Sequence, residues 1–358
     1  MIQFMPKFLE NGVLDRQPIN QGLLQSVRLV GEYRGKQALF KQQSSQVLEA
    51  LRENAVIQST ESSNRIEGVV APLERIRELV AHRTTPANRS EQEIAGYREV
   101  LSTIHSHPED IRLTPYVVLQ LHRDLFQFAP GGGGHWKSAD NDIIERRPDG
   151  TSVVRFKPVP AHLIADSMER LHTEFSATLD AGTVEPLLLI PAYVLDFSCI
   201  HPFADGNGRM ARLLSLRRLY QAGYEVGRYI SLETAIENTK EGYYDALQAS
   251  SQNWHESQHS LVPWWEYFVG VMLVKAYREF EDRVGATGTK RGAKRDMIRD
   301  VVNHLPNEFR YADLERALPA VSRPTIARAL RELSAEGVIR CVGRGRDATW
   351  KKTPAIAS

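Results

Sequence analysis

Residues 186–212 read PLLLIPAYVLDFSCIHPFADGNGRMAR, and this stretch predicts the centre of the fold. Residues 186–200 form an apolar run of helical length. A second helix with several leucines is expected over residues 207–222. The polar residues between them therefore lie in a loop held by two core helices, which is a rigid place to mount reactive groups.

The residue types of this loop suit the binding of phosphate. Gly206 and Gly208 allow backbone N–H groups to turn inward as an anion-binding nest, which opens onto a helix N-terminus. Asn207 adds a side-chain donor. Arg209 and Arg212 are three residues apart, so they are expected to share a helix face and to form a fork for phosphate oxygens.

Three further residues of this stretch bear on chemistry. Asp205 offers a hard oxygen ligand for a Mg²⁺ ion that bridges phosphates, and His201 can act as a base near neutral pH. Each feature alone is more often structural, and only the combination is specific. A metal-hydrolase site is disfavoured because no further His or Cys ligands accompany these two residues. Cys199 has apolar neighbours, which predict a buried, inert thiol rather than a nucleophile.

Most of the chain before residue 285 is predicted to be helical. Thr114 is expected to cap a helix that has proline at its first position. Four glycines at 131–134 are most simply explained as a mobile connector, whereas residues 142–158, with a turn at 148–150, predict a β-hairpin. The other expected helices are 91–106, 161–178, 186–200, 207–222, 240–251 and 262–284.

The loop HPFADGNGR resembles the signature of Fic (Fido) domain proteins at all of its nine positions. The hairpin at 142–158 resembles the Fic flap, and residues 230–247 resemble the stretch that follows the Fic core. The resemblance extends over about residues 40–280. One departure is Lys137, because many relatives have an arginine at this place.

The resemblance implies a mainly α fold and an activity. Fic enzymes usually transfer AMP from Mg²⁺-ATP to a hydroxyl group of a target protein, and the flap would clamp an extended segment of that target. By motif position, His201 would deprotonate the target hydroxyl, Asp205 would hold Mg²⁺ and Arg209 would stabilise the departing pyrophosphate. The nucleotide-binding residues implied by the motif are Phe203, Asp205, Gly206, Asn207, Gly208, Arg209 and Arg212.

Residues 63–68, SNRIEG, match the inhibitory motif of Fic proteins. Ser63, Glu67 and Gly68 occupy its defining positions, and Glu67 would compete with the γ-phosphate of ATP for Arg212. The plainer alternative is a helix end with Gly68 as its C-cap. Glu67 is also a candidate to position water for the removal of AMP from a modified target.

The net charge of +1 hides two parts of opposite sign. Of the 45 Lys+Arg and 44 Asp+Glu residues, 15 and 8 lie in residues 286–358, which leaves 30 and 36 for residues 1–285. The last part is thus basic, at +7, and follows a Gly-rich linker at 285–289. Residues 294–352 resemble a winged helix-turn-helix, with Ser322 as the cap of its third helix and arginines in its wing at 343–346. Such a unit could bind DNA or mediate protein contact and dimerisation.

Three domains are therefore expected: a helical region with the inhibitory helix (1–110), a Fic domain (111–284) and a winged helix domain (285–358). The function implied first is an autoinhibited protein adenylyltransferase. The alternatives are removal of AMP, transfer of another phosphate-containing group, or a nucleotide-sensing DNA-binding regulator. Two distant cysteines, an N-terminus unlike a signal peptide and no long apolar run predict a cytoplasmic protein with no membrane contact, and a homodimer is left open.

Overall fold

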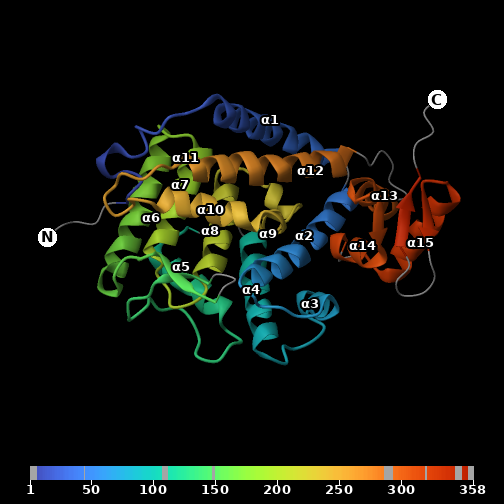
Figure 1. Cartoon of the computed structure of the whole chain (residues 1–358), viewed down its shortest axis with the longest axis horizontal. Coiled ribbons are helices and arrows are strands. Elements are labelled where there is room, and N and C mark those ends of the chain that lie inside the picture. Colours follow the sequence, from blue (N-terminus) through green and yellow to red (C-terminus); the bar gives the residue numbers. More distant parts are fainter. Residues whose placement is uncertain are drawn as a thin grey trace.

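The computed structural model describes residues 6–43, 45–106, 112–146, 150–285, 293–318, 321–342 and 349–353. The fold is mainly α, as predicted, and Figure 1 shows helices packed around a central pair, α7 and α8. The helices of the main body are α1 (Gln21–Gln43), α2 (Ser45–Ile66), α3 (Leu73–Val80), α4 (Arg89–Ser106), α5 (Pro115–Leu125), α6 (Ile164–Ala181), α7 (Pro186–Ile200), α8 (Asn207–Gln221), α9 (Leu232–Asn238), α10 (Lys240–Ser251), α11 (Val262–Trp265), a π-helix η4 (Glu266–Leu273) and α12 (Val274–Gly285).

The two central helices are buried on nearly every side. Helix α7 begins at Pro186, and the Glu185 side chain accepts a hydrogen bond from the backbone N–H of Leu187 at 3.4 Å. Its apolar residues are buried around the whole helix, which explains an apolar run without helical periodicity. Helix α8 is also buried, although it carries several arginines. Helices α2 and α4 pack on α8, and α6 packs on α7. Helix α5 lies against α4 and α6 and completes the frame of the loop at 201–206.

The four glycines at 131–134 differ from the expected mobile connector, because part of the run packs closely against α5. A Cβ atom at Gly133 would overlap the backbone carbonyl of His122, and one at Gly134 would lie 2.8 Å from Cβ of Arg123. The N–H of Gly134 also donates to the His122 ring at 2.9 Å. The absence of side chains therefore serves close packing here. The helix itself begins as predicted, with the Thr114 hydroxyl accepting from Val117 N–H at 3.3 Å.

The predicted hairpin is present as strands β1 (Ile143–Arg146) and β2 (Ser152–Phe156), which pair antiparallel. The turn was expected at 148–150, and residues 147–149 lie outside the described residues. The Arg155 side chain donates to Gln248 on α10 at 2.6 Å, which ties β2 to the body of the protein. Ile144 and Val154 are exposed on the hairpin at 56% and 45%.

The C-terminal unit contains α13 (Ala293–His304), β3 (Glu308–Arg310), α14 (Tyr311–Ala317), α15 (Arg323–Ala335), β4 (Ile339–Val342) and β5 (Thr349–Lys352). Its three strands form an antiparallel sheet in the order β3-β5-β4, of which β3 was not anticipated from the sequence. Ser322 precedes α15 as predicted, but its hydroxyl contacts that of Thr325 at 2.9 Å and caps no backbone group. The expected wing tip and most of the linker lie outside the described residues, and the winged-helix assignment stays a prediction.

Figure 1 shows the C-terminal unit beside the middle of α2, and α13 packs directly on that helix. Trp254, Trp264 and Trp265 belong to the core of the main body, each with 1% exposure. Helices α1 and α12 run side by side along one face. In the parts of the chain that the structure describes, no helix is long and apolar enough to cross a membrane.

Candidate active site

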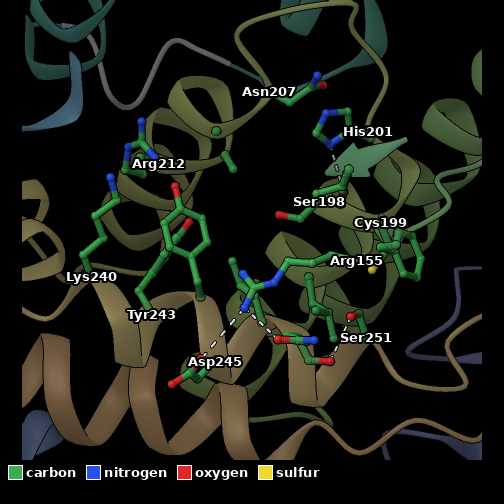
Figure 2. Close-up of a pocket in the computed structure, with 18 of the residues that line it drawn as sticks. Arg155, Ser198, Cys199, His201, Asn207, Arg212, Lys240, Tyr243, Asp245 and Ser251 are labelled. Atoms are coloured by element: carbon green, nitrogen blue, oxygen red, sulfur yellow. Dashed lines mark hydrogen bonds and ion pairs between the residues drawn. The ribbon is translucent and has the colours of Figure 1, made fainter. Parts of the chain in front are cut away.

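A cavity of about 920 Å³ opens between the loop at 201–208, the hairpin and α10. Figure 2 shows Arg212 and Lys240 on one side of it and His201 on the other. Its size is within the range of small-molecule sites. The lining residues include Glu67, Ile143, Ile144, Arg155, Phe156, Ser198, Cys199, His201, Asn207, Gly208, Arg212, Lys240, Tyr243, Tyr244 and Gln248.

His201 ends α7 in the left-handed region, with φ 52° and ψ 62°. This conformation is uncommon for a residue with a side chain and is often retained at functional sites. Its Nδ1 lies 3.3 Å from the carbonyl oxygen of Ser198, which can only accept, so Nδ1 carries the proton. Burial lowers the pKa of His201 to about 4, and the nearby Lys137 charge adds to this effect. The imidazole is therefore neutral at pH 7, with Nε2 able to accept a proton.

The loop after His201 is held by its own side chains. Oδ1 of Asn207 accepts from Phe203 N–H at 2.9 Å, and its Nδ2 donates to Phe203 carbonyl at 2.7 Å. The Asn207 side chain, predicted to donate to phosphate, thus holds the loop together through these two hydrogen bonds. The Phe203 side chain is fully buried and anchors the loop, and its contact with a nucleotide stays a prediction. Gly206 precedes α8 with φ 81°, and a Cβ there would lie 2.8 Å from the Phe126 ring.

The structure brings residues 63–68 to Arg212. The Arg212 guanidinium donates to the Ser63 hydroxyl at 2.8 Å, the Ser63 carbonyl at 2.9 Å and the Glu67 carboxylate at 2.8 Å. Ser63 and Arg212 are buried, whereas the Glu67 side chain retains 31% exposure at the cavity. Gly68 follows with φ 80° at the end of α2 and donates to the Arg65 carbonyl. The segment therefore contains both features expected of it, a glycine-terminated helix and a carboxylate on Arg212.

The Glu67 carboxylate also covers the N-terminus of α8. A Cβ atom at Gly208 would overlap Oε1 of Glu67, so the carboxylate lies directly against this glycine. Burial acts to raise the pKa of Glu67, but the charge and hydrogen bond of Arg212 outweigh it, and the pKa is lowered. Lys240 and Arg209 lower it further. An ionised carboxylate thus occupies the place where the sequence predicts that an anion binds.

Arg209 and Arg212 do not form the expected fork, because each is held by a different acid. Arg209 Nη1 donates to the Glu93 carboxylate of α4 at 2.7 Å, with side-chain exposures of 2% and 6%. Its Nη2 lies 3.7 Å from Asp205. The three-residue spacing places both arginines on α8, but the packing of α2 and α4 decides which way each guanidinium points.

Asp205 fits the role of a magnesium ligand. Its side chain is 61% exposed, and Oδ1 accepts from Gly206 N–H at 2.6 Å. Mg²⁺ in nucleotide sites is usually held by one or two carboxylates together with phosphate oxygens, and an exposed carboxylate beside an anion-binding loop meets this requirement. Among the described residues, no group of three or more His, Cys, Asp or Glu side chains could hold a metal by itself.

Two residues of the site, Glu93 and Lys240, had no motif to reveal them. Glu93 pairs with Arg209, and Lys240 donates to the carbonyl of Ile66 at 2.9 Å, next to Glu67. Lys137 lies close enough to lower the pKa of His201, but its ammonium group donates to Asn141 at 2.8 Å. The only sign of Glu93 in the sequence was its place on the apolar side of a predicted helix. A glutamate that is buried in this way is usually paired with a cation.

Residues 112–219 match the model of the Fic/DOC family, so this part of the chain is a Fic domain. The match is narrower than the range 40–280 over which a resemblance was expected. A relative from Nematostella vectensis named protein adenylyltransferase Fic is 27% identical over 183 residues, which make up 49% of this chain and 40% of that protein. The protein of the same name from Drosophila melanogaster is 29% identical over 188 residues, or 51% and 36% of the two chains. The chain thus spans less than half the length of these relatives.

Solved structures show the same fold. A Fic family protein from Desulfovibrio desulfuricans has a TM-score of 0.61 at 23% identity, and the alignment covers 95% of this chain and 98% of that one. A Fic domain containing signaling protein from Bacteroides thetaiotaomicron has a TM-score of 0.61 at 18% identity, with coverage of 73% and 100%. The chain therefore has a mainly α Fic fold, and its likeness to the first structure extends well beyond residues 112–219.

Proposed function

We propose that this protein is a protein adenylyltransferase that moves AMP from Mg²⁺-ATP to a Ser, Thr or Tyr hydroxyl of a target protein, and that Glu67 inhibits it. One observation supports this most: His201 faces a cavity with Nε2 able to accept a proton, while Glu67 pairs with Arg212 and covers Gly208. The names of the Nematostella and Drosophila relatives agree with this class of reaction.

The geometry supports an in-line transfer. His201 Nε2 takes the proton of the target hydroxyl, whose oxygen forms a bond to the α-phosphorus. The bond from this phosphorus to the bridging oxygen of the β-phosphate breaks, and pyrophosphate leaves with the electron pair. The α8 N-terminus and Arg212 neutralise the phosphates once Glu67 has moved. Mg²⁺ bound at Asp205 would add further charge neutralisation to the α- and β-phosphates.

Labelled ATP tests the proposal. The purified chain and its Glu67→Gly variant are incubated with a cell lysate and ATP that carries label in either the α- or the γ-phosphate. Compared with lysate alone, we expect additional protein labelling from the α-position only, stronger in Glu67→Gly and lost when His201→Ala is added. Additional incorporation of the γ-label would indicate transfer of a different group, and no additional incorporation in any variant would contradict the proposal.

A matched variant separates the inhibitory contact from a general effect on α2. Glu61 lies in the same helix and pairs with Arg65, not with Arg212. Glu67→Gln and Glu61→Gln therefore each remove one charge from α2. We expect increased labelling for Glu67→Gln alone, because only this change weakens the hold on Arg212. Equal increases in both variants would contradict the role of Glu67.

A second activity, hydrolytic removal of AMP, is favoured by the same carboxylate. Glu67 is ionised beside the phosphate site and can orient a water molecule or take its proton. The substrate for the test is Glu67→Gly protein that has labelled itself. We expect wild type to release AMP from this material faster than added Glu67→Gly protein does. Equal release by both would exclude this activity.

Binding of DNA by the C-terminal unit and formation of a homodimer stay predictions. At the start of α15, Arg323 is held by Glu315 at 2.6 Å, and Arg295 lies 3.1 Å from Glu332. These pairs reduce the positive charge available to a phosphate backbone. If the unit binds duplex DNA, the affinity should fall steeply with added salt, and no mobility shift at low salt would exclude it.

A further inference from the structure

His122 of α5 connects three segments below the loop. Its Nδ1 lies 2.9 Å from the N–H of Gly134, and its Nε2 lies 3.1 Å from the carbonyl oxygen of Asp205. The ring also stacks on Phe203, with centroids 3.7 Å apart and planes 3° from parallel. Only 6% of the residue is exposed. The His122 side chain thus contacts Gly134 of the glycine run, the buried ring of Phe203 and the backbone carbonyl of Asp205.

The two hydrogen bonds determine the state of the ring. The Gly134 N–H can only donate, so Nδ1 must present its lone pair. The Asp205 carbonyl can only accept, so Nε2 must carry the proton. His122 is therefore a neutral imidazole with its proton on Nε2, and neither the doubly protonated ring nor the other tautomer makes both bonds.

The surroundings leave this ring little freedom. Gly133 and Gly134 approach α5 so closely that side chains there would meet His122 and Arg123. On the other side of the loop, the Phe203 and Trp136 rings are neighbours, with centroids 5.2 Å apart. The backbone carbonyl of Pro202 also accepts a hydrogen bond from the N–H of Lys137 at 2.8 Å. The bond to the Asp205 carbonyl is thus made by a rigid group.

We propose that His122 is a positioning residue that fixes the backbone of Asp205 for binding of the nucleotide phosphates. The next residue, Gly206, begins the turn into α8 with φ 81°, so the carbonyl of Asp205 orients both the acidic side chain and the first amides of the anion site. This inference rests on the proposed function for the identity of the ligand. His122 itself touches no substrate, because its ring lies beneath the loop and is absent from the cavity lining.

Two amide variants separate the bonds. In His122→Gln the terminal NH₂ can reach the place of Nε2 and keep the bond to Asp205, whereas in His122→Asn the shorter oxygen matches Nδ1 and keeps the bond to Gly134. Each is made in a Glu67→Gly chain, and calorimetry measures the dissociation constant of a non-hydrolysable ATP analogue with Mg²⁺. Melting temperatures are recorded alongside.

We expect the dissociation constant of His122→Gln to stay within about threefold of the parent and that of His122→Asn to rise about tenfold, as loss of one buried hydrogen bond implies. Equal effects in both variants, or effects that follow the melting temperature alone, would overturn the proposal. The readout is binding and not AMP transfer, so a chain that binds the analogue but transfers no AMP would contradict the proposed function and leave the role of His122 intact. Nitrogen NMR of the unmutated chain gives a second check, since a proton on Nδ1 of His122 would also overturn it.

A different set of contacts links the inhibitory helix to the C-terminal unit. In the middle of α2, the Asn54 amide lies 3.5 Å from the sulfur of Met297 on α13, and Gln58 donates to the carbonyl of Ala317 at 3.0 Å. From neighbouring α3, Arg77 donates to the carbonyl of Glu315 at 3.4 Å. Met297 is 3% exposed, so its side chain is covered at this junction.

The same helix places Ser63 and Glu67 on Arg212. An α-helix rises about 1.5 Å per residue, so about 13 Å separate Gln58 from Glu67. We infer that the docked C-terminal unit holds α2 in its inhibitory position. A partner that loosens this junction would release Glu67, and binding of ATP would loosen the junction in return, because such coupling is reciprocal.

Met297→Asp would place a charge in the junction, and Met297→Leu is the matched control. Each is measured in the full chain with Glu67 and with Glu67→Gly, using the dissociation constant of the ATP analogue. We expect Met297→Asp to tighten binding by about threefold to tenfold when Glu67 is present and to have no effect in Glu67→Gly. The same change in both backgrounds, or no change in either, would overturn the inference.

Hydrogen exchange of the unmutated chain provides a check that needs no substitution. We expect faster exchange in residues 293–304 when the ATP analogue is bound, because the junction then loosens. Unchanged or slower exchange in α13 at saturating analogue would also overturn the inference. Both measurements report binding and mobility, so they stand apart from whether AMP is transferred.

Discussion

The buried pair of Glu93 and Arg209 should be among the most sensitive contacts of the domain. Its N–O distance is 2.7 Å, and the two side chains are 6% and 2% exposed. Glu93→Ala would leave a buried guanidinium without its main acid, which typically lowers the free energy of unfolding by about 3–5 kcal/mol. The Nε of Arg209 already has no hydrogen-bond partner among the described residues. The loss of Glu93 would therefore add to an existing shortage of acceptors around this guanidinium.

Arg89 offers a control on the same carboxylate. It pairs with Glu93 at 3.0 Å, but its side chain is 75% exposed. Arg89→Ala should therefore cost at most about 1 kcal/mol, because solvent screens such pairs. Glu93→Gln keeps an acceptor for Arg209, so its loss of unfolding free energy should lie between those of Arg89→Ala and Glu93→Ala, at about 1–3 kcal/mol.

Urea unfolding followed by tryptophan fluorescence measures these differences, because Trp254, Trp264 and Trp265 lie in the core of the main body. The expected order of stability is wild type, Arg89→Ala, Glu93→Gln and then Glu93→Ala. A loss below about 1 kcal/mol in Glu93→Ala would contradict this prediction, because a buried guanidinium that loses its main acid should destabilise the fold by more than that. Equal losses in Glu93→Ala and Arg89→Ala would refute it as well.

Three further predictions follow from other contacts. Gly133→Ala should lower the melting temperature more than Gly208→Ala, because the added Cβ meets a backbone carbonyl at the first position and the movable Glu67 carboxylate at the second; equal losses would contradict this. Since the pKa of His201 is lowered to about 4, transfer should be lost only as the pH falls through that value, and Lys137→Met should move this limb to higher pH in a pH–rate profile. Burial raises the pKa of Asp196 to about 7, so the folded state favours the protonated acid and stability should fall as the pH rises from about 4 to 7. Asp196→Asn should remove this trend in urea midpoints, and a trend unchanged in that variant would exclude Asp196 as its source.

Helix ends were the most predictable part of the fold. The bounds 186–200 and 240–251 agree with α7 and α10, and the helix after Thr114 begins as expected. Proline in a first turn and a capping hydroxyl act on neighbouring backbone groups, so their signals are local. Strand β3 was missed because its three residues gain their structure by pairing with β5, some 40 residues later in the chain.

The backbone of the loop at 201–208 depends on local sequence, because the end of α7, the turn at Gly206 and the hydrogen bonds between Asn207 and Phe203 all involve residues close in the chain. The partners of the charged groups depend instead on how the helices pack. Arg209 meets an acid 116 residues earlier, Arg212 one 145 residues earlier, and the His122 ring a carbonyl 83 residues later. Spacing along α8 predicted a fork, but a guanidinium turns toward the carboxylate that helix packing brings within reach. Sequence neighbours set the backbone, whereas the choice of ion-pair partner requires the positions of α2 and α4 in space.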